Sequence, residues 1–176
     1  MALYLIESSL KEVVSAKEEL NEKVSTLQSA LNEKNASLIE VQVSKDFARS
    51  FFIVEGENQD VATEVLKAAG IPVELVKEVR LVGKDLNDVK KKDDVVNYLV
   101  EWNIPADITM DQYLARKKKN SVHYQEVPEV AFSRTYVCED MSKCLCFYDA
   151  PDEAAVKRAR EAVNTPIDSI TELAGE

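Results

Sequence analysis

The residues best suited to chemistry lie in the second half of the chain, which holds all three cysteines. Cys144 and Cys146 are two positions apart, so on a β-strand their side chains share one face, about 6.5 Å apart along the chain. Two thiolates at that distance bind a soft metal ion only if further ligands converge on it. Cys138 and His123 could supply them. The alternative is that the cysteines pack in a core as small hydrophobic residues.

His123 is the only histidine, and it stands beside Tyr124 with Glu126 close by. A histidine can serve as a metal ligand or transfer protons near neutral pH. A lone histidine among polar residues is more often simply solvated. His123 is therefore a candidate metal ligand or general base that needs partners from other parts of the fold.

The chain repeats itself at an offset of 94 residues, as from Tyr4 to Tyr98. Few residues are identical, but apolar, charged and proline positions agree at that offset in every segment. The matching segments include 2–7 with 96–101, 43–49 with 137–143, and 71–73 with 165–167. The constant offset predicts a duplication, with a first repeat at residues 1–83, a charged linker at 84–95 and a second repeat at 96–176.

Each repeat reads as strand, helix, strand, strand, helix and strand, the split βαβ order of ferredoxin-like folds. The predicted strands are 2–7, 37–43, 49–55 and 74–82, then 96–101, 131–138, 143–149 and 168–173. Capping-box spacing predicts helix starts at Ser9 and at Thr109. The first of these helices runs to about Lys34, and the second stops near Asn120, followed by an extended or looped segment. Gly70 and Asn164 are predicted ends of the other two helices.

Both faces of the predicted strands are apolar. Phe51 and Ile53 point one way while Phe52 and Val54 point the other, so neither face suits water. Helices can cover only one face, and we expect the sister sheet to cover the other in a pseudo-dimeric α+β barrel. The space between the sheets is then the natural ligand cavity. Its candidate lining residues are Tyr98, Glu101, Trp102, His123, Tyr124, Cys144, Cys146 and Tyr148.

Glu7 and Glu101 occupy equivalent positions at the ends of the two opening strands. Such a carboxylate pair could bind a cation, or one member could act as a general base. The alternative is two exposed acids at strand ends. Tyr4 and Tyr98, also equivalent, could line the cavity or fill it.

The formal net charge of −10 makes nucleic acid and anionic membranes poor partners. No apolar run suits a signal peptide or a membrane helix, so we expect a cytoplasmic protein. The sequence has no GxGxxG, Walker, HExxH or GxSxG motif. These absences leave small-ligand or metal binding, or an enzyme that needs no cofactor.

Residues 135–152 (TYVCEDMSKCLCFYDAPD) resemble a family of small bacterial ferredoxin-like proteins, most of unknown function. Cys146, Tyr148, Ala150 and Pro151 fit the family's spacing, and residues 166–168 fit its closing segment. One branch is nickel-binding and dimeric, so the resemblance implies the fold, the dimer-like barrel and a homo-oligomer. It does not carry the metal over to this chain, in which His123, Cys144 and Cys146 are the candidate ligands for nickel or another divalent metal. The single histidine leaves that ligand set incomplete, and the first repeat lacks both the cysteine and the Ala-Pro pair.

Three functions remain open. The first is a non-catalytic protein that binds a small ligand or a divalent metal between the sheets. The second is a cofactor-independent enzyme of the monooxygenase, cyclase or isomerase type, with His123 or Glu101 as its acid or base. The third is an assembly module that docks a partner through the long first helix, whose apolar spacing also suits packing on a sheet.

Overall fold

The computed structural model describes residues 1–92 and 94–174. Contacts divide the chain into two compact units, Met1–Val79 and Arg80–Glu176. Residue 93 of the expected linker, and residues 175 and 176, lie outside the described part. Among the described residues, no helix is both long and apolar enough to cross a bilayer.

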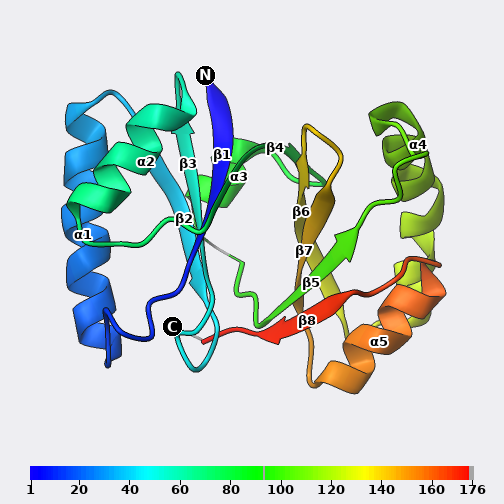
Figure 1. Cartoon of the computed structure of the whole chain (residues 1–176). Helices are drawn as coiled ribbons and strands as arrows, with labels where there is room; N and C mark the ends of the chain where they lie inside the picture. The colour runs from blue at the N-terminus through cyan, green and yellow to red at the C-terminus, as the bar shows by residue number, and fades with distance from the viewer. Residues whose placement is uncertain (93, 175–176) are drawn as a thin grey trace. The chain divides into compact units, whose positions relative to one another are not determined.

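The first unit holds four antiparallel strands in the order β2-β3-β1-β4 (Figure 1). Its elements are β1 (Ala2–Ser8), α1 (Lys17–Glu33), β2 (Ser37–Val43), β3 (Ser50–Gly56), α2 (Gln59–Ala68) and β4 (Leu75–Val82). Helices α1 and α2 cover one face of these strands. Leu20, Leu27 and Leu31 anchor α1 because their spacing places them on one side of the helix, where all are buried.

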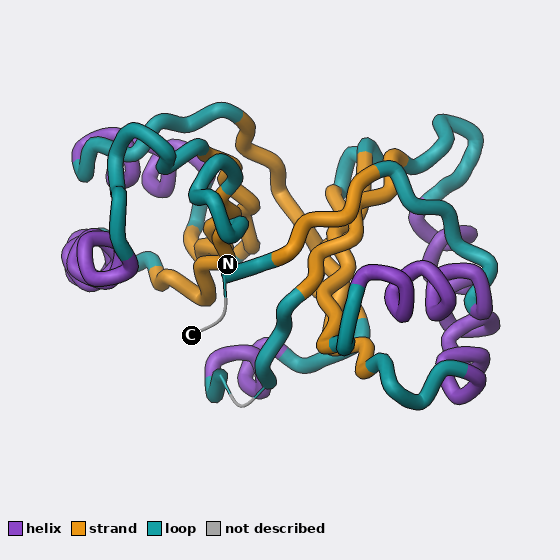
Figure 2. Tube along the Cα trace, turned by 90° about the horizontal axis from the view of Figure 1, so that it is seen from below, coloured by secondary structure: helices purple, strands orange, loops and turns teal. Residues whose placement is uncertain are grey.

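The second unit has the same plan, with strand order β6-β7-β5-β8. Its elements are α3 (Leu86–Lys90), β5 (Tyr98–Asn103), α4 (Met110–Asn120), the 3₁₀ helix η1 (Ser121–Glu126), β6 (Ala131–Cys138), β7 (Lys143–Asp149), α5 (Glu153–Ala162) and β8 (Ser169–Glu172). Figure 2 shows the helices of each unit gathered beside their own strands. Apart from the short helix α3, which lies where only a charged linker was predicted, and η1, the order of strands and helices follows the sequence-based prediction in both units.

The two units share local backbone features at the 94-residue offset. A register shift interrupts β2 between Leu38 and Glu40, and the equivalent shift interrupts β6 between Phe132 and Arg134. Phe47 and Met141 both have left-handed backbone at the hairpin tips, with φ of 60° and 63°. Such features depend on particular side chains and turns, so their repetition supports the duplication.

The ends of α2 and α5 also agree. Gly70 follows α2 with φ of 80°, and Asn164 follows α5 with φ of 51°. In each case a backbone N–H beyond the helix end donates to a carbonyl in its last turns, from Ile71 to Leu66 and from Thr165 to Arg160, both at 3.0 Å. This left-handed ending suits glycine and asparagine, which confirms both predicted helix stops.

Two local predictions are wrong. The first helix begins at Lys17, not at Ser9, because Leu10 donates its N–H to Phe47 (3.0 Å) and is buried with Val14 in a separate turn. The segment after Asn120 is not extended at first but forms the 3₁₀ helix η1. By contrast, the capping box at Thr109 is present as predicted.

Candidate functional site

The helix-covered face of the second sheet is polar where its counterpart is apolar. Strand register pairs Val100 with Cys146 and Trp102 with Cys144, so these side chains share that face. Three residues of this face are polar where the first unit, 94 residues earlier, has apolar ones: Arg160 in place of Leu66, Cys146 in place of Phe52 and Tyr148 in place of Val54. All six residues are buried. Since the first unit builds this layer with apolar side chains, the fold does not require the polar set, which points to a function.

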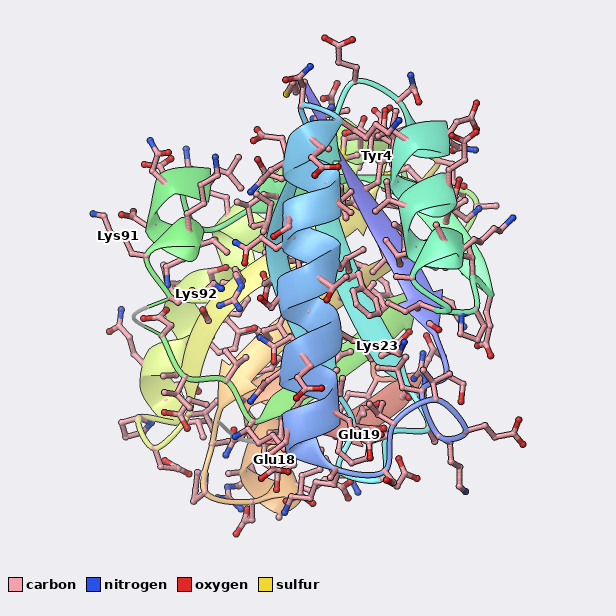
Figure 3. All side chains as sticks on the ribbon, turned by 90° about the vertical axis from the view of Figure 1, so that its left-hand side faces the viewer. Tyr4, Glu18, Glu19, Lys23, Lys91 and Lys92 are labelled. Atoms are coloured by element: carbon pink, nitrogen blue, oxygen red, sulfur yellow. The ribbon has the colours of Figure 1, made fainter. Side chains whose placement is uncertain are left out.

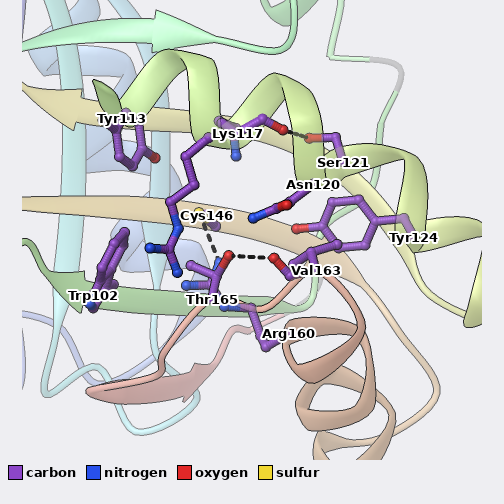
Figure 4. Close-up of a pocket in the computed structure, with 11 residues that line it drawn as sticks. Trp102, Tyr113, Lys117, Asn120, Ser121, Tyr124, Cys146, Arg160, Val163 and Thr165 are labelled. Carbon is purple, nitrogen blue, oxygen red and sulfur yellow. Dashed lines mark hydrogen bonds between the residues drawn. The ribbon is translucent and has the colours of Figure 1, made fainter. Parts of the chain in front are cut away.

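A pocket opens between this face and the helices of the second unit (Figure 4). The enclosed part of the pocket is only about 20 Å³, and the empty space reaches about 340 Å³ when the open mouth is counted. Figure 4 shows Lys117, Asn120 and Ser121 entering from α4 and the turn after it, while Arg160 enters from α5. The lining residues are Trp102, Tyr113, Arg116, Lys117, Asn120, Ser121, Tyr124, Cys146, Arg160, Val163 and Thr165.

Arg160 is the most unusual of them, because its side chain is only 2% exposed. Its Nη1 lies 3.4 Å from the Cys146 Sγ and 3.1 Å from the Tyr148 hydroxyl, and its Nη2 donates to the Pro166 carbonyl at 2.6 Å. Among the described residues, its Nε has no hydrogen-bond partner. A buried guanidinium with a spare donor is costly unless an anion compensates it.

Cys146 provides part of that compensation. A hydrogen bond from the Cys144 thiol, together with the charges of Lys117 and Arg160, holds the pKa of Cys146 well below its ordinary value, although burial opposes this. The Thr135 hydroxyl donates a further hydrogen bond to the sulfur at 3.2 Å. The pKa of Cys144 is raised, first by its bond to Cys146 and then by burial. Of the two thiols, Cys146 is therefore the one that these contacts favour as a thiolate.

Three tyrosines complete the polar layer. The hydroxyls of Tyr124 and Tyr148 are 2.6 Å apart. Burial raises the pKa of Tyr113, of Tyr148 and of Tyr124, the last to about 12. These hydroxyls stay protonated at neutral pH, so they can donate hydrogen bonds but cannot act as bases there.

Two more cations face the pocket. The Arg116 guanidinium lies 5.4 Å from the Trp102 ring centroid, and the Lys117 ammonium lies 4.4 Å from that of Phe132. Arg116 donates from Nη2 to the Asn164 carbonyl, but its buried Nε has no partner among the described residues. None of the described lining residues carries a carboxylate, and the three cations Arg116, Lys117 and Arg160 outnumber the Cys146 sulfur. In a chain of net charge −10, this pocket is a locally positive site.

The structure brings together most of the candidate lining residues, but on a different face from the one expected. The face lies under the helices of the second unit, not in a cavity between two sheets, and holds Tyr98, Trp102, Tyr124, Cys144, Cys146 and Tyr148. Glu101 is not part of it, because its carboxylate pairs with Lys143 at 2.7 Å. The equivalent Glu7 pairs with Arg49 at 3.0 Å, so neither strand-end acid is an exposed, solvated carboxylate.

His123 lies on the exposed side of η1, where its Nδ1 is 2.7 Å from Glu126. It does not line the pocket. Among residues 1–92 and 94–174, no group of three or more histidine, cysteine or acidic side chains could hold a metal ion. The set His123, Cys144 and Cys146 is therefore not assembled, and the donors present do not fit a nickel centre.

Sequence reasoning missed Arg160, Arg116 and Lys117. A signal for Arg160 was present, because the arginine interrupts the apolar side of a helix at the position that Leu66 occupies in the first repeat. The lysine triplet at 117–119 reads as a solvated helix face. Only Lys117 among its members is partly buried against the pocket, which the sequence does not distinguish.

Residues 98–173 match the family model described as nickel responsive protein SCO4226-like. The second unit carries that family's sequence pattern. The match confirms the resemblance seen in residues 135–152, and it lies wholly within the second unit. The crystal structure of SCO4226 from Streptomyces coelicolor A3(2) shows 20% identity over 43% of this chain and 93% of that chain, with a TM-score of 0.38. No curated protein matches the chain.

Two other solved structures align along nearly the whole chain. One is TA0507, provisionally named a chlorite dismutase, with 12% identity over 99% of this chain and 95% of that chain and a TM-score of 0.57. The other, from Lactobacillus acidophilus NCFM, is provisionally named a monooxygenase, with 12% identity over 99% and 94% and a TM-score of 0.52. At these identities the likeness concerns the fold alone. It confirms the predicted α+β class of tandem ferredoxin-like repeats.

Proposed function

We propose that the second unit binds a small organic anion, such as an aromatic carboxylate, with its anionic group in the pocket beneath α4 and α5 and its body in the open mouth. The observation that carries this proposal is the convergence of Arg116, Lys117 and Arg160 on a pocket with no acidic lining residue. Guanidinium and ammonium groups are the side chains that recognise carboxylates. The rings of Trp102 and Tyr113, 6.2 Å apart, provide apolar walls for the body of the ligand.

Two buried arginine Nε atoms without partners favour an anion over a neutral ligand. An unsatisfied buried donor costs free energy that an acceptor in the pocket would recover. The Lys117 ammonium lies over the Phe132 ring and its charge acts on Cys146, so it adds positive charge beside the pocket that an anion can pair with. The site thus has spare donors and positive charge in the same small volume.

The family description favours a metal instead, since the model that matches residues 98–173 is named nickel responsive. The second unit offers positive charge and two thiols where a nickel site needs several converging donors. Positive charge near a site also disfavours binding of a divalent cation. The donor set of this chain therefore supports an anion rather than nickel.

An enzyme is the weaker alternative. The two groups suggested as its acid or base, His123 and Glu101, lie outside the pocket, one exposed and one paired with Lys143. The tyrosines of the pocket keep their protons at neutral pH. Binding without turnover is the function that these side chains support best.

Docking through α1 has little support from its surface. Figure 3 shows α1 with the charged side chains Glu18, Glu19 and Lys23 along it. The large exposed hydrophobic residues of the described chain are Met1, Val95 and Val122, none of them in α1. The apolar spacing of this helix is used in packing on its own sheet, as Leu20, Leu27 and Leu31 show.

The test is titration calorimetry of the full chain with benzoate, compared with benzylamine, a cation of similar shape. Benzoate should bind and raise the melting temperature, because a ligand that binds only the folded state stabilises it. Lys117→Gln should weaken benzoate binding by about 10-fold to 150-fold, since a hydrogen bond to a charged group contributes about 1.5–3 kcal/mol. The exposed neighbour Lys118→Gln is the matched control and should leave affinity unchanged.

Nickel(II) chloride is titrated in a separate arm. We expect no stoichiometric nickel binding with either variant or with the native chain. Equal affinity for benzoate and benzylamine, or an equal loss in both lysine variants, would contradict an anion site. Tight nickel binding that disappears in Cys144→Ala would instead support the metal function.

A further inference from the structure

Cys146 has an environment that its two fellow cysteines lack. It lies in the wall of the pocket, where its Sγ accepts a hydrogen bond from the Thr135 hydroxyl at 3.2 Å and from Arg160 Nη1 at 3.4 Å. Cys144 stands beside it on the same strand and the same face. Cys138 lies away from the pocket lining, and burial raises the pKa of its thiol.

The repeat shows that this environment is not a packing necessity. The residues equivalent to Cys146, Thr135 and Arg160 in the first unit are Phe52, Val41 and Leu66, which form an apolar layer in the same register. The second unit replaces all three with a sulfur and two donors that contact it. A thiolate is far more nucleophilic than a thiol, and donors of this kind keep it ionised.

We propose that Cys146 is a peroxide-reactive thiolate, and that Cys144 is the thiol that converts its oxidised form to a disulfide. Cys146 combines access through the pocket, an arginine and a hydroxyl at its sulfur, and a second thiol next to it. The combination of a stabilised thiolate with a neighbouring thiol is typical of redox-sensing cysteines. Because the side chain is only 1% exposed, the site selects a small oxidant such as hydrogen peroxide.

The first step forms an S–O bond between the Cys146 thiolate and the terminal oxygen of the peroxide. The O–O bond breaks, the thiolate loses two electrons to become a sulfenic acid, and the departing hydroxide takes a proton from solvent and leaves as water. The spare Nε of Arg160 is a donor in the same pocket that can bind a peroxide oxygen. In the second step the Cys144 sulfur attacks the Cys146 sulfur, forms the S–S bond, and releases a second water.

The disulfide should be easy to reduce. Residues two apart on a strand have Cα atoms about 6.5 Å apart, near the upper end of the range that disulfides tolerate. Strained disulfides have higher reduction potentials and open readily with thiols. An external dithiol would therefore return both cysteines to the reduced state, so the oxidation is reversible.

The test treats the reduced full chain with hydrogen peroxide and follows the masses of two tryptic peptides. Residues 144–157 carry both Cys144 and Cys146, while residues 135–143 carry Cys138 as an internal control. The first peptide should lose two hydrogen atoms, and dithiothreitol should restore it, before the second peptide reacts. In Cys144→Ser, Cys146 should instead gain one oxygen and be trapped by dimedone.

Two variants place the residues of the first unit at the equivalent positions of the second unit. Arg160→Leu and Thr135→Val should each slow oxidation of Cys146. For Arg160→Leu we expect a slowing of about tenfold or more, because each unit by which the thiol pKa exceeds the solution pH removes about nine-tenths of the thiolate. Thr135→Val nearly preserves side-chain volume, so it remains informative if Arg160→Leu folds poorly. Circular dichroism of each variant checks the fold.

Oxidation of Cys138 as fast as Cys146, or unchanged rates in both folded variants, would overturn the peroxide-reactive thiolate. Persistent sulfenic acid in the native chain, with no disulfide, would overturn the role of Cys144. The inference does not rest on benzoate binding, because oxidation is measured without it. If the chain binds benzoate but Cys138 and Cys146 are oxidised at the same rate, the redox role of Cys146 is wrong and the anion site is unaffected.

Discussion

At the scale of single residues, the second unit differs from the first by its buried hydroxyl and charged groups. Tyr113, Tyr124 and Tyr148 meet around Cys146 and Arg160, and their hydroxyls stay protonated because burial raises their pKa. Burial of such groups costs free energy, and hydrogen bonds between them recover only part of it. The equivalent layer of the first unit avoids this cost, because Leu66, Phe52 and Val54 are apolar.

These tyrosines make stability depend on alkaline pH. Their pKa is raised in the folded state, to about 12 for Tyr124, while an unfolded tyrosine titrates near 10. Between these values the folded chain holds protons that the unfolded chain releases, so stability falls as pH rises above about 10. The expected loss approaches about 1.4 kcal/mol per pH unit for each tyrosine, measured by urea unfolding.

Tyr148→Phe removes one titrating group and should flatten this pH dependence. A full-strength decline in the variant would show that other groups cause it. Below pH 9 all three tyrosines are protonated in both states, so they should add no pH dependence there.

At the scale of elements, the two repeats start their second helices alike. The Asn58 side chain accepts a hydrogen bond from Val61 N at 3.1 Å, and Asp152, at the 94-residue offset, accepts one from Ala155 N at 2.8 Å. These caps satisfy N–H groups that have no partner inside the helix. Helix α5 carries Arg160 into the pocket, so its cap also supports the site.

Substitution of either cap should cost about 1 kcal/mol of stability. Hydrogen exchange is the measurement that locates the loss. Asn58→Ala should speed amide exchange in α2, and Asp152→Ala should do so in α5. Equal exchange in both helices with either variant would show that the caps act through a shared unfolding event rather than locally.

At the scale of the whole molecule, every residue of the anion pocket belongs to the second unit. A core defect in the first unit should therefore lower the stability of the chain without changing the pocket. Leu66→Ala removes a fully buried side chain and should cost about 2–5 kcal/mol. In the folded variant, benzoate affinity by titration calorimetry should stay within about twofold of the native value, since the contacts of the ligand are unchanged.

The matched control is Arg160→Leu, which places leucine in the second unit at the position equivalent to Leu66 of the first. In the folded protein it should abolish much of the benzoate affinity, because it removes a buried guanidinium from the lining of the pocket. Loss of benzoate binding in folded Leu66→Ala would mean that the site needs the first unit.

The order and most boundaries of the strands and helices could be predicted from the amino-acid sequence. Strand alternation, the Thr109 capping box and the helix stops at Gly70 and Asn164 depend on neighbours within a few residues, so they can be read from the chain. The start of α1 could not, because Leu10 is held by Phe47, which is distant in sequence. A helix start predicted from local capping spacing does not form where a buried contact with a distant segment holds the chain in another conformation.

The roles of the polar residues, in contrast, depend on packing between elements and could not be predicted from the sequence. Trp102, Tyr124, Cys146 and Tyr148 were candidates from the sequence, but the side of the sheet on which they meet follows from strand register and helix cover. Arg160 becomes the counter-ion of Cys146 because α5 packs across β7, a contact between separate elements. The charge and pKa of a site depend on such distances in space, which sequence spacing alone does not fix.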